Sequence, residues 1–203
     1  MLDDTQLKSL CGKMGVPLEF VGFKDELPKK LKYNRSYIIN LDNTIDDEGE
    51  DNEGTHWTCL QVNQYPNGKI EPIFFDPYGA EPSQSIVKFV KDNCGKYLPY
   101  NKRDIQSLMN NACGWYCCAY LHFINASQYR CKDLYEDTEK FLNMFDDLNH
   151  STDFKKNEYI LKHFFRSNDP KLRKEIDIIS PTSHIMGEDE KGSIRIPVDM
   201  KMM

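Results

Sequence analysis

The spacing of apolar residues predicts regular secondary structure from the start of the chain. A helical pattern covers residues 3–14 and ends at Gly15, a residue that commonly terminates helices. The apolar, β-branched run at 36–43 predicts a buried strand. Residues 56–79 alternate apolar and polar positions on both sides of Pro66-Asn67-Gly68. This pattern predicts two antiparallel strands joined by a tight turn.

The second half of the chain is predicted to be mainly helical. Pro82 near the start and Gly95 at the end favour a helix over 81–95. A nearly uniform apolar run is typical of a helix at the centre of a core. The elements expected after residue 95 are a strand at 97–106, the central apolar helix at 114–126, and amphipathic helices at 133–148 and 152–166. From residue 167 onward the periodicity is weak, which predicts an extended arm or a disordered tail.

Composition indicates a folded protein with one domain of catalytic size. The chain has 203 residues, of which 39% are hydrophobic and 12% aromatic. No apolar run reaches the roughly 20 residues that a membrane span requires, so no membrane partner is predicted. The N-terminal residues lack the pattern of a secretory signal, so a reducing compartment is expected. The seven cysteines are therefore predicted to be thiols.

Charge argues against strong binding to nucleic acid. The net charge is -6, and the acidic side chains concentrate in the run 42–54. We interpret this run as a solvated loop, with a recognition surface for basic partners as the alternative. The densest basic cluster is only Lys29, Lys30 and Lys32. Strong nucleic-acid binding is not predicted.

The predicted hairpin brings a histidine and an aspartate together. His56 opens the first strand and Asp76 closes the second, at similar distances from the turn. Antiparallel pairing should place both side chains near one edge of the sheet. An imidazole held by a carboxylate has a fixed tautomer and a stabilised charged form. Such a pair can serve as general base for a serine or cysteine nucleophile.

Cys113 is the candidate nucleophile. It precedes the apolar helix, where unpaired backbone N–H groups and the helix dipole stabilise a thiolate. Gly114 leaves room beside it, whereas Cys117 and Cys118 lie among apolar residues and are expected to be core. The backbone N–H of Cys113 and the side-chain amide of Gln106 are candidate donors to an oxyanion.

Each of these residues also has a plain structural explanation. A lone histidine before Trp57 is commonly structural, and an aspartate before Pro77 is a common turn residue. Three cysteines within six residues raise the alternative of zinc, but no second Cys or His pair at ligand spacing lies nearby, and His122 is far down the helix. No metal and no cofactor are predicted. The joint order of His, Asp, Gln and Cys-Gly favours a catalytic site.

At these residues the sequence resembles the adenovirus-type (adenain-like) maturation cysteine proteases, and more distantly the proteases that process ubiquitin-like modifiers. The motifs that carry the resemblance are "GTHW", "FFDPYG" and "IQSLMNNACGWYCCAYLH", within residues 54–123. The chain length and the Cys-Cys pair resemble the viral branch, which includes proteases of virophages and other large DNA viruses.

The resemblance implies a role for each motif residue. Cys113 would be the nucleophile, His56 the general base, Asp76 its orienting partner and Gln106 an oxyanion-hole side chain. Trp57 and Gly114 would lie at the substrate site. The implied fold is α/β (α+β), papain-like or adenain-like, with a small mixed sheet packed against the helix of the nucleophile. Residues 1–166 would form the protease domain and 167–203 a C-terminal extension.

The function implied is cleavage of capsid or other virion precursor proteins at glycine-containing sites. The expected partners are that protein substrate and an activating peptide or virion component, and the expected location is the virion and the host-cell cytoplasm. Two alternatives stay open. One is a deconjugating or processing peptidase for ubiquitin-like proteins, and the other is a catalytically idle binding module of the same fold.

Overall fold

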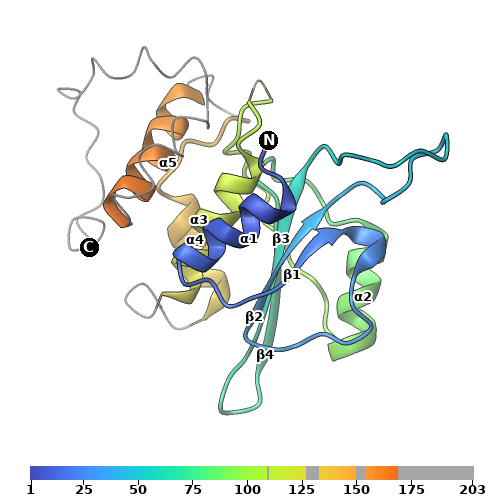
Figure 1. Cartoon of the computed structure of the whole chain (residues 1–203). Helices are drawn as coiled ribbons and strands as arrows, with labels where there is room; N and C mark the ends of the chain where they lie inside the picture. Colours follow the sequence, from blue (N-terminus) through green and yellow to red (C-terminus); the bar gives the residue numbers. More distant parts are fainter. Residues whose placement is uncertain (109, 127–132, 150–153, 169–203) are drawn as a thin grey trace.

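A four-stranded mixed sheet lies at the centre of the protein (Figure 1). The computed structural model describes residues 1–108, 110–126, 133–149 and 154–168. The strands run in the order β1-β2-β3-β4; β1 pairs with β2 in parallel, and the other two pairs are antiparallel. The strands are β1 (Leu18–Phe23), β2 (Arg35–Asn40), β3 (Trp57–Gln64) and β4 (Ile70–Phe75).

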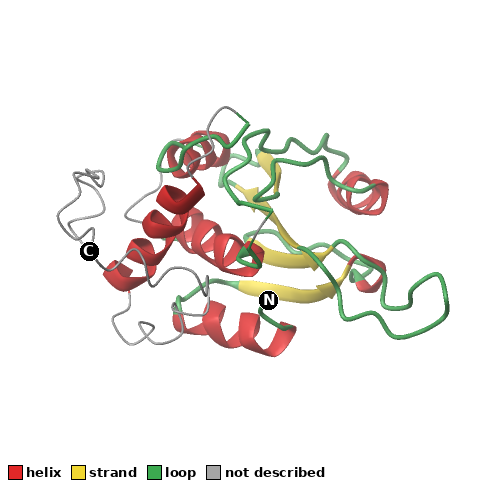
Figure 2. Cartoon of the chain, turned by 90° about the horizontal axis from the view of Figure 1, so that it is seen from above, coloured by secondary structure: helices red, strands yellow, loops and turns green. Residues whose placement is uncertain are grey.

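Helices cover both faces of the sheet. One face is covered by α2, and the other four α-helices lie on the opposite side (Figures 1 and 2). The helices are α1 (Asp4–Lys13), α2 (Gln84–Cys94), α3 (Cys113–Asn125), α4 (Leu134–Leu142) and α5 (Phe154–Asn168), with a short 3-10 helix, η1 (Lys24–Glu26), after β1. The protein is therefore a mixed α/β protein of the α+β type.

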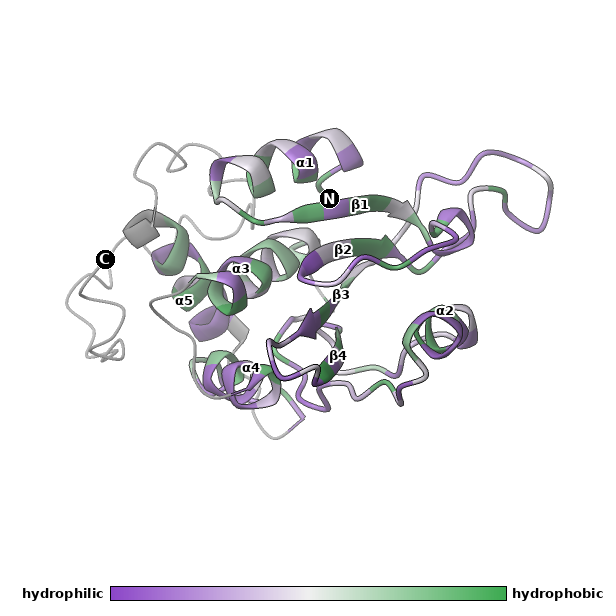
Figure 3. Ribbon diagram, turned by 90° about the horizontal axis from the view of Figure 1, so that it is seen from below, coloured by the Kyte–Doolittle hydropathy of each residue, from purple (hydrophilic) through white to green (hydrophobic). Residues whose placement is uncertain are grey.

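The strands bury side chains on both faces. In β2, Ile38 belongs to the core cluster around α3, while its neighbours Tyr37 and Ile39 belong to the cluster around α2. In β4, Phe75 belongs to the cluster around α3 and Phe74 to the cluster around α2. Successive strand residues point to opposite faces, so a sheet covered twice needs apolar residues at consecutive positions. Figure 3 shows hydrophobic stretches within the strands and a mostly hydrophilic loop between β2 and β3.

Helix α3 is the central element of the larger core. Every residue from Cys113 to Ile124 is buried except His122, which is partly exposed. The ring of Tyr120 stacks on Phe75 of β4 with centroids 4.2 Å apart. Phe141 of α4 packs edge-on against both rings. The prediction of a central apolar helix is confirmed.

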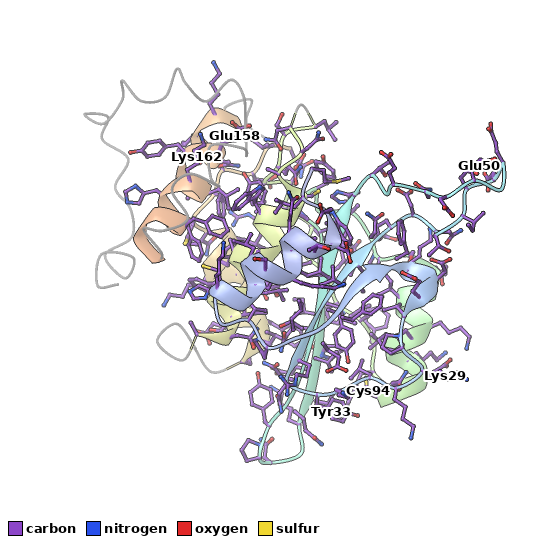
Figure 4. All side chains as sticks on the ribbon, viewed as in Figure 1. Lys29, Tyr33, Glu50, Cys94, Glu158 and Lys162 are labelled. Atoms are coloured by element: carbon purple, nitrogen blue, oxygen red, sulfur yellow. The ribbon has the colours of Figure 1, made fainter. Side chains whose placement is uncertain are left out.

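Most predicted elements are confirmed, including the opening helix, the hairpin and α2. The hairpin turn closes with a hydrogen bond from Tyr65 N–H to the Lys69 carbonyl. The helix predicted over 133–148 ends at Leu142, with Asn143 as its C-cap. The acidic run is a loop whose charged side chains are mostly exposed, with Glu50 at its outer end, as predicted for a solvated loop (Figure 4).

One strand was not predicted, and one predicted strand is not formed. The sequence analysis did not predict β1, a short edge strand that holds Gly22 in its interior. The strand expected over 97–106 is not formed: a single bridge joins Phe74 to Tyr100. Pro99 accepts a hydrogen bond from Phe74 through its carbonyl but has no N–H to donate. A ladder cannot continue through that position.

The predicted domain boundary lies at the end of α5. This helix runs to Asn168, two residues beyond the predicted end of the domain. The arm or tail predicted for the remaining residues lies outside the described part of the chain. Among the described helices, none combines the length and apolarity needed to cross a membrane.

The aromatic cluster around Phe141 gives a test of this core. Phe141 is fully buried and contacts the rings of Phe75, Tyr120 and Phe164. Phe141→Ala should lower the free energy of unfolding by about 3–5 kcal/mol, because it removes the buried ring and leaves a cavity. Urea unfolding measures this loss. Tyr97→Ala is the control: Tyr97 is 89% exposed, so its loss should change stability by less than about 0.5 kcal/mol.

Candidate active site

His56 and Asp76 meet at one edge of the sheet, as the hairpin predicts. His56 immediately precedes β3 and Asp76 immediately follows β4. The register pairs Cys59 with Phe75, which places the two side chains diagonally across the ends of the strands. Nε2 of His56 lies 2.8 Å from Oδ1 of Asp76. The predicted juxtaposition is confirmed.

Asp76 is fully buried and held by backbone and side-chain contacts. Its Oδ1 also accepts a hydrogen bond from the backbone N–H of Tyr78 at 2.8 Å. Asn101 accepts from the Asp76 backbone N–H at 2.8 Å and donates to its carbonyl at 2.7 Å. These bonds fix the carboxylate toward His56. The sequence analysis did not identify Asn101, whose loop is brought to β4 only by the tertiary fold.

The imidazole of His56 is poised to carry a positive charge. Burial alone lowers the pKa of His56, but hydrogen bonding to Asp76 and interaction with the Cys113 thiol outweigh it and raise the pKa from 6.5 to about 9. Nδ1 of His56 is buried and forms no hydrogen bond with the described protein atoms. With Nε2 directed at Asp76, Nδ1 is the nitrogen left to exchange a proton with a reacting group.

Cys113 is the first residue of α3 and lies beside His56. Its Sγ is 3.5 Å from the backbone N–H nitrogen of Trp57, at the start of β3. The preceding residue, Ala112, has no polar side chain to cap the helix, so the first-turn N–H groups are left for other acceptors. Cys113 is only 2% exposed, and Sδ of Met1 lies 3.7 Å from its Sγ.

Gln106 belongs to the same cluster but is not directed at the thiol by a hydrogen bond. Its side chain is fully buried, and Nε2 donates to the Tyr78 hydroxyl at 3.1 Å and to the Asn110 carbonyl at 3.2 Å. Its Oε1 has no partner among the described residues. Both amide hydrogens are thus occupied, and one would have to be released to bind an oxyanion. That role of Gln106 stays a prediction.

Trp57 and Gly114 form packing contacts in this structure. The indole of Trp57 is 4% exposed and donates to the Leu2 carbonyl at 2.8 Å. A Cβ on Gly114 would lie 2.9 Å from a methyl carbon of Leu7 in α1. Glycine therefore lets α1 approach the start of α3 closely. The expectation that these residues contact substrate stays a prediction.

Cys117 and Cys118 are core residues, as predicted. Both are fully buried, and burial raises the pKa of each thiol well above its usual value. The Cys117 thiol donates to the Trp57 carbonyl at 3.3 Å, and Cys118 lies 3.3 Å from Cys11 of α1. The six cysteines in the described part of the chain are free. Cys131 lies outside it.

The described residues hold no group of three or more His, Cys, Asp and Glu side chains placed to bind a metal ion. His122, considered above as a distant zinc ligand, uses Nδ1 to bond the Met14 carbonyl at 2.7 Å. That contact joins α3 to the end of α1.

A pocket of about 360 Å³ adjoins the N-terminal residues that cover the thiol. It lies along α1 and is lined by Leu2, Thr5, Gln6, Ser9, Leu10, Lys13 and Trp115. Leu2 of this lining accepts a hydrogen bond from the indole of Trp57, the residue next to His56 in the cluster of His56, Asp76, Gln106 and Cys113. The pocket contains none of those four side chains.

Comparison with known proteins identifies no family. No protein-family model and no curated protein matches the sequence. One distant structural neighbour is HopZ1a, whose crystal structure is of a complex with IP6, at 13% sequence identity and a TM-score of 0.41. The match covers 97% of this chain and 63% of HopZ1a, so the chain spans less than two thirds of that protein.

Selective alkylation tests the pairing of Cys113 and His56. Treating the folded protein with iodoacetamide at about pH 6.5 should label Cys113 first, because an adjacent imidazolium and the helix N-terminus stabilise a thiolate. Peptide mass mapping follows all seven cysteines. In His56→Ala, Cys113 should lose this advantage. Equal labelling of Cys113 and partly exposed Cys94 in the wild type would contradict the pairing.

The raised pKa of His56 also predicts a pH dependence of folding. The folded protein binds this proton more tightly than the unfolded chain, so the contribution is fully present below pH 6.5 and is lost as pH rises through about 9. We expect wild-type stability to fall by about 1–3 kcal/mol more than that of His56→Gln over this range. Urea unfolding at several pH values measures the difference, and parallel curves would argue against a charged His56 in the folded protein.

Proposed function

We propose that this chain is a cysteine endopeptidase of the adenovirus maturation type. The single observation that carries the proposal is the position of the largely covered His56 imidazole, bonded to Asp76 and adjacent to the Cys113 thiol at the start of α3. An activated thiol, an oriented base and free helix N–H groups are the parts that acyl transfer requires. The motif resemblance around these residues supports the same reaction.

In the proposed reaction, Cys113 is the nucleophile, and His56 accepts and then donates a proton. The Cys113 proton passes to Nδ1 of His56, and Sγ attacks the peptide carbonyl carbon. The resulting oxyanion is stabilised by backbone N–H groups at the start of α3, with Gln106 as the candidate side-chain donor. The C–N bond breaks as His56 protonates the leaving amine, which leaves a thioester. His56 then takes a proton from water, whose oxygen attacks the thioester carbon. The C–S bond breaks, the acid is released, and His56 returns the proton to Sγ of Cys113.

The buried thiol supports cleavage at glycine-containing sites. Cys113 is nearly inaccessible, enclosed by the start of β3 and by Met1. A peptide must approach closely to bring its carbonyl carbon to Sγ, and a residue without Cβ allows that approach. We propose virion or capsid precursors as substrates. The protease would act on them in the virion or in the host-cell cytoplasm. An activating peptide or virion component is proposed as a partner.

Cleavage assays with active-site variants test the proposed reaction. The full chain is incubated with peptides that carry glycine at successive positions, and the products are identified by mass. Cys113→Ala should lower the cleavage rate by about 10³-fold or more, because no other group supplies the nucleophile. Cys118→Ala is the matched control, since it removes a buried thiol one turn away and should affect stability rather than cleavage.

The outcomes separate the proposed function from its alternatives. Undiminished cleavage by Cys113→Ala would refute the assignment. If glycine peptides are left intact while a ubiquitin-like protein with a C-terminal extension is cut, the processing-peptidase alternative is correct. If Cys113 shows no enhanced reactivity and no substrate is cut, a binding module becomes the better interpretation.

A further inference from the structure

Tyr78 contacts three of the four residues proposed for catalysis. Its backbone N–H bonds Oδ1 of Asp76, the oxygen that also faces His56. Its ring stacks on the His56 imidazole, with centroids 4.5 Å apart and planes inclined by 24°. Its hydroxyl accepts a hydrogen bond from the side-chain amide of Gln106 at 3.1 Å. One residue thus joins the base, its carboxylate and the candidate oxyanion donor.

The backbone around Tyr78 is held firmly. The turn is closed by a hydrogen bond from Gly79 N–H to the Asp76 carbonyl at 2.8 Å. Gly79 has φ of 70°, and a Cβ there would lie 2.8 Å from the Arg103 backbone, so glycine is required. The Pro77 carbonyl accepts N–H groups from the loop that carries Gln106. Backbone hydrogen bonds therefore hold this turn against both the end of β4 and the loop that carries Gln106.

The hydroxyl of Tyr78 stays protonated at neutral pH. Burial, with the nearby Cys113, Asp76 and Asp104, raises the pKa of Tyr78 to about 12. A neutral phenol accepts the Gln106 bond without adding a negative charge near the thiol. The ring remains a neutral π surface against the charged form of His56, an arrangement that favours the imidazolium.

We propose that Tyr78 is a positioning residue that aligns the His56 ring by stacking and aims the Gln106 amide through its hydroxyl. This inference rests on the proposed function, because it assigns Tyr78 a role in that reaction. It separates two physical contributions within one side chain. The ring acts on the proton equilibrium of His56 and Cys113, whereas the hydroxyl acts on the placement of Gln106.

Two substitutions in the full chain separate these contributions. Tyr78→Phe keeps the stacked ring and removes the acceptor for Gln106. We expect it to lower kcat on a glycine peptide about tenfold, to leave KM within about twofold, and to leave the pH profile of Cys113 alkylation unchanged. Tyr78→Leu removes the stack as well, so its alkylation profile should move to higher pH. Tyr100→Phe is the control, since its hydroxyl donates to the exposed Glu81 at 2.7 Å.

Each result supports or overturns the inference. The inference is overturned if both Tyr78 variants keep the wild-type kcat and the wild-type pH profile of Cys113 alkylation. It is also overturned if both variants change kcat and the alkylation profile equally, because a role in packing alone would produce that result. The Tyr78→Phe result decides alone if Tyr78→Leu does not fold. A wild-type Cys113 without enhanced reactivity refutes the proposed function and this inference together. A reactive wild type with unaffected variants refutes the role of Tyr78 only.

Discussion

The arrangement of the candidate site depends on the burial of α3 between the sheet and the surrounding helices. Because nearly every side chain of this helix is covered, α3 cannot rotate or slide without opening a cavity or exposing apolar surface. Its first residue is therefore fixed against the start of β3, where the Cys113 thiol meets the Trp57 N–H. The same packing stabilises the fold and sets the place of the proposed nucleophile.

The register of the β3–β4 hairpin is the second constraint on the site. Side chains alternate between faces, so a slip of one residue would turn His56 and Asp76 away from each other. The slip would also move Phe75 out of the core around α3. The packing of neighbouring hairpin residues into two different cores thus maintains the distance between base and carboxylate. Core packing and site geometry select the same register.

Local patterns in the sequence were sufficient for the helices, the hairpin and the position of Cys113 at a helix start. They also predicted the pairing of His56 with Asp76, because turn position and strand period determine which residues meet. The positions of Tyr78 and Asn101 could not be derived in this way. Both act from loops, and the contacts of loop residues follow from tertiary packing rather than from periodicity. Tyr78 stood within the "FFDPYG" motif, but its stacking on His56 had no sequence signal.

The charges around the site determine how an oxyanion could be stabilised. Burial and the nearby charges of Asp147 and Asp76 raise the pKa of Asp104, on the loop that carries Gln106, to about 6, so this carboxyl ionises less readily than usual. In the proposed reaction, an oxyanion beside Cys113 would need hydrogen-bond donors already in place. The imidazolium of His56 supplies one positive charge, but it must give up its proton to the leaving group. The uncapped N–H groups of α3 do not change protonation, so they can stabilise negative charge throughout the proposed reaction.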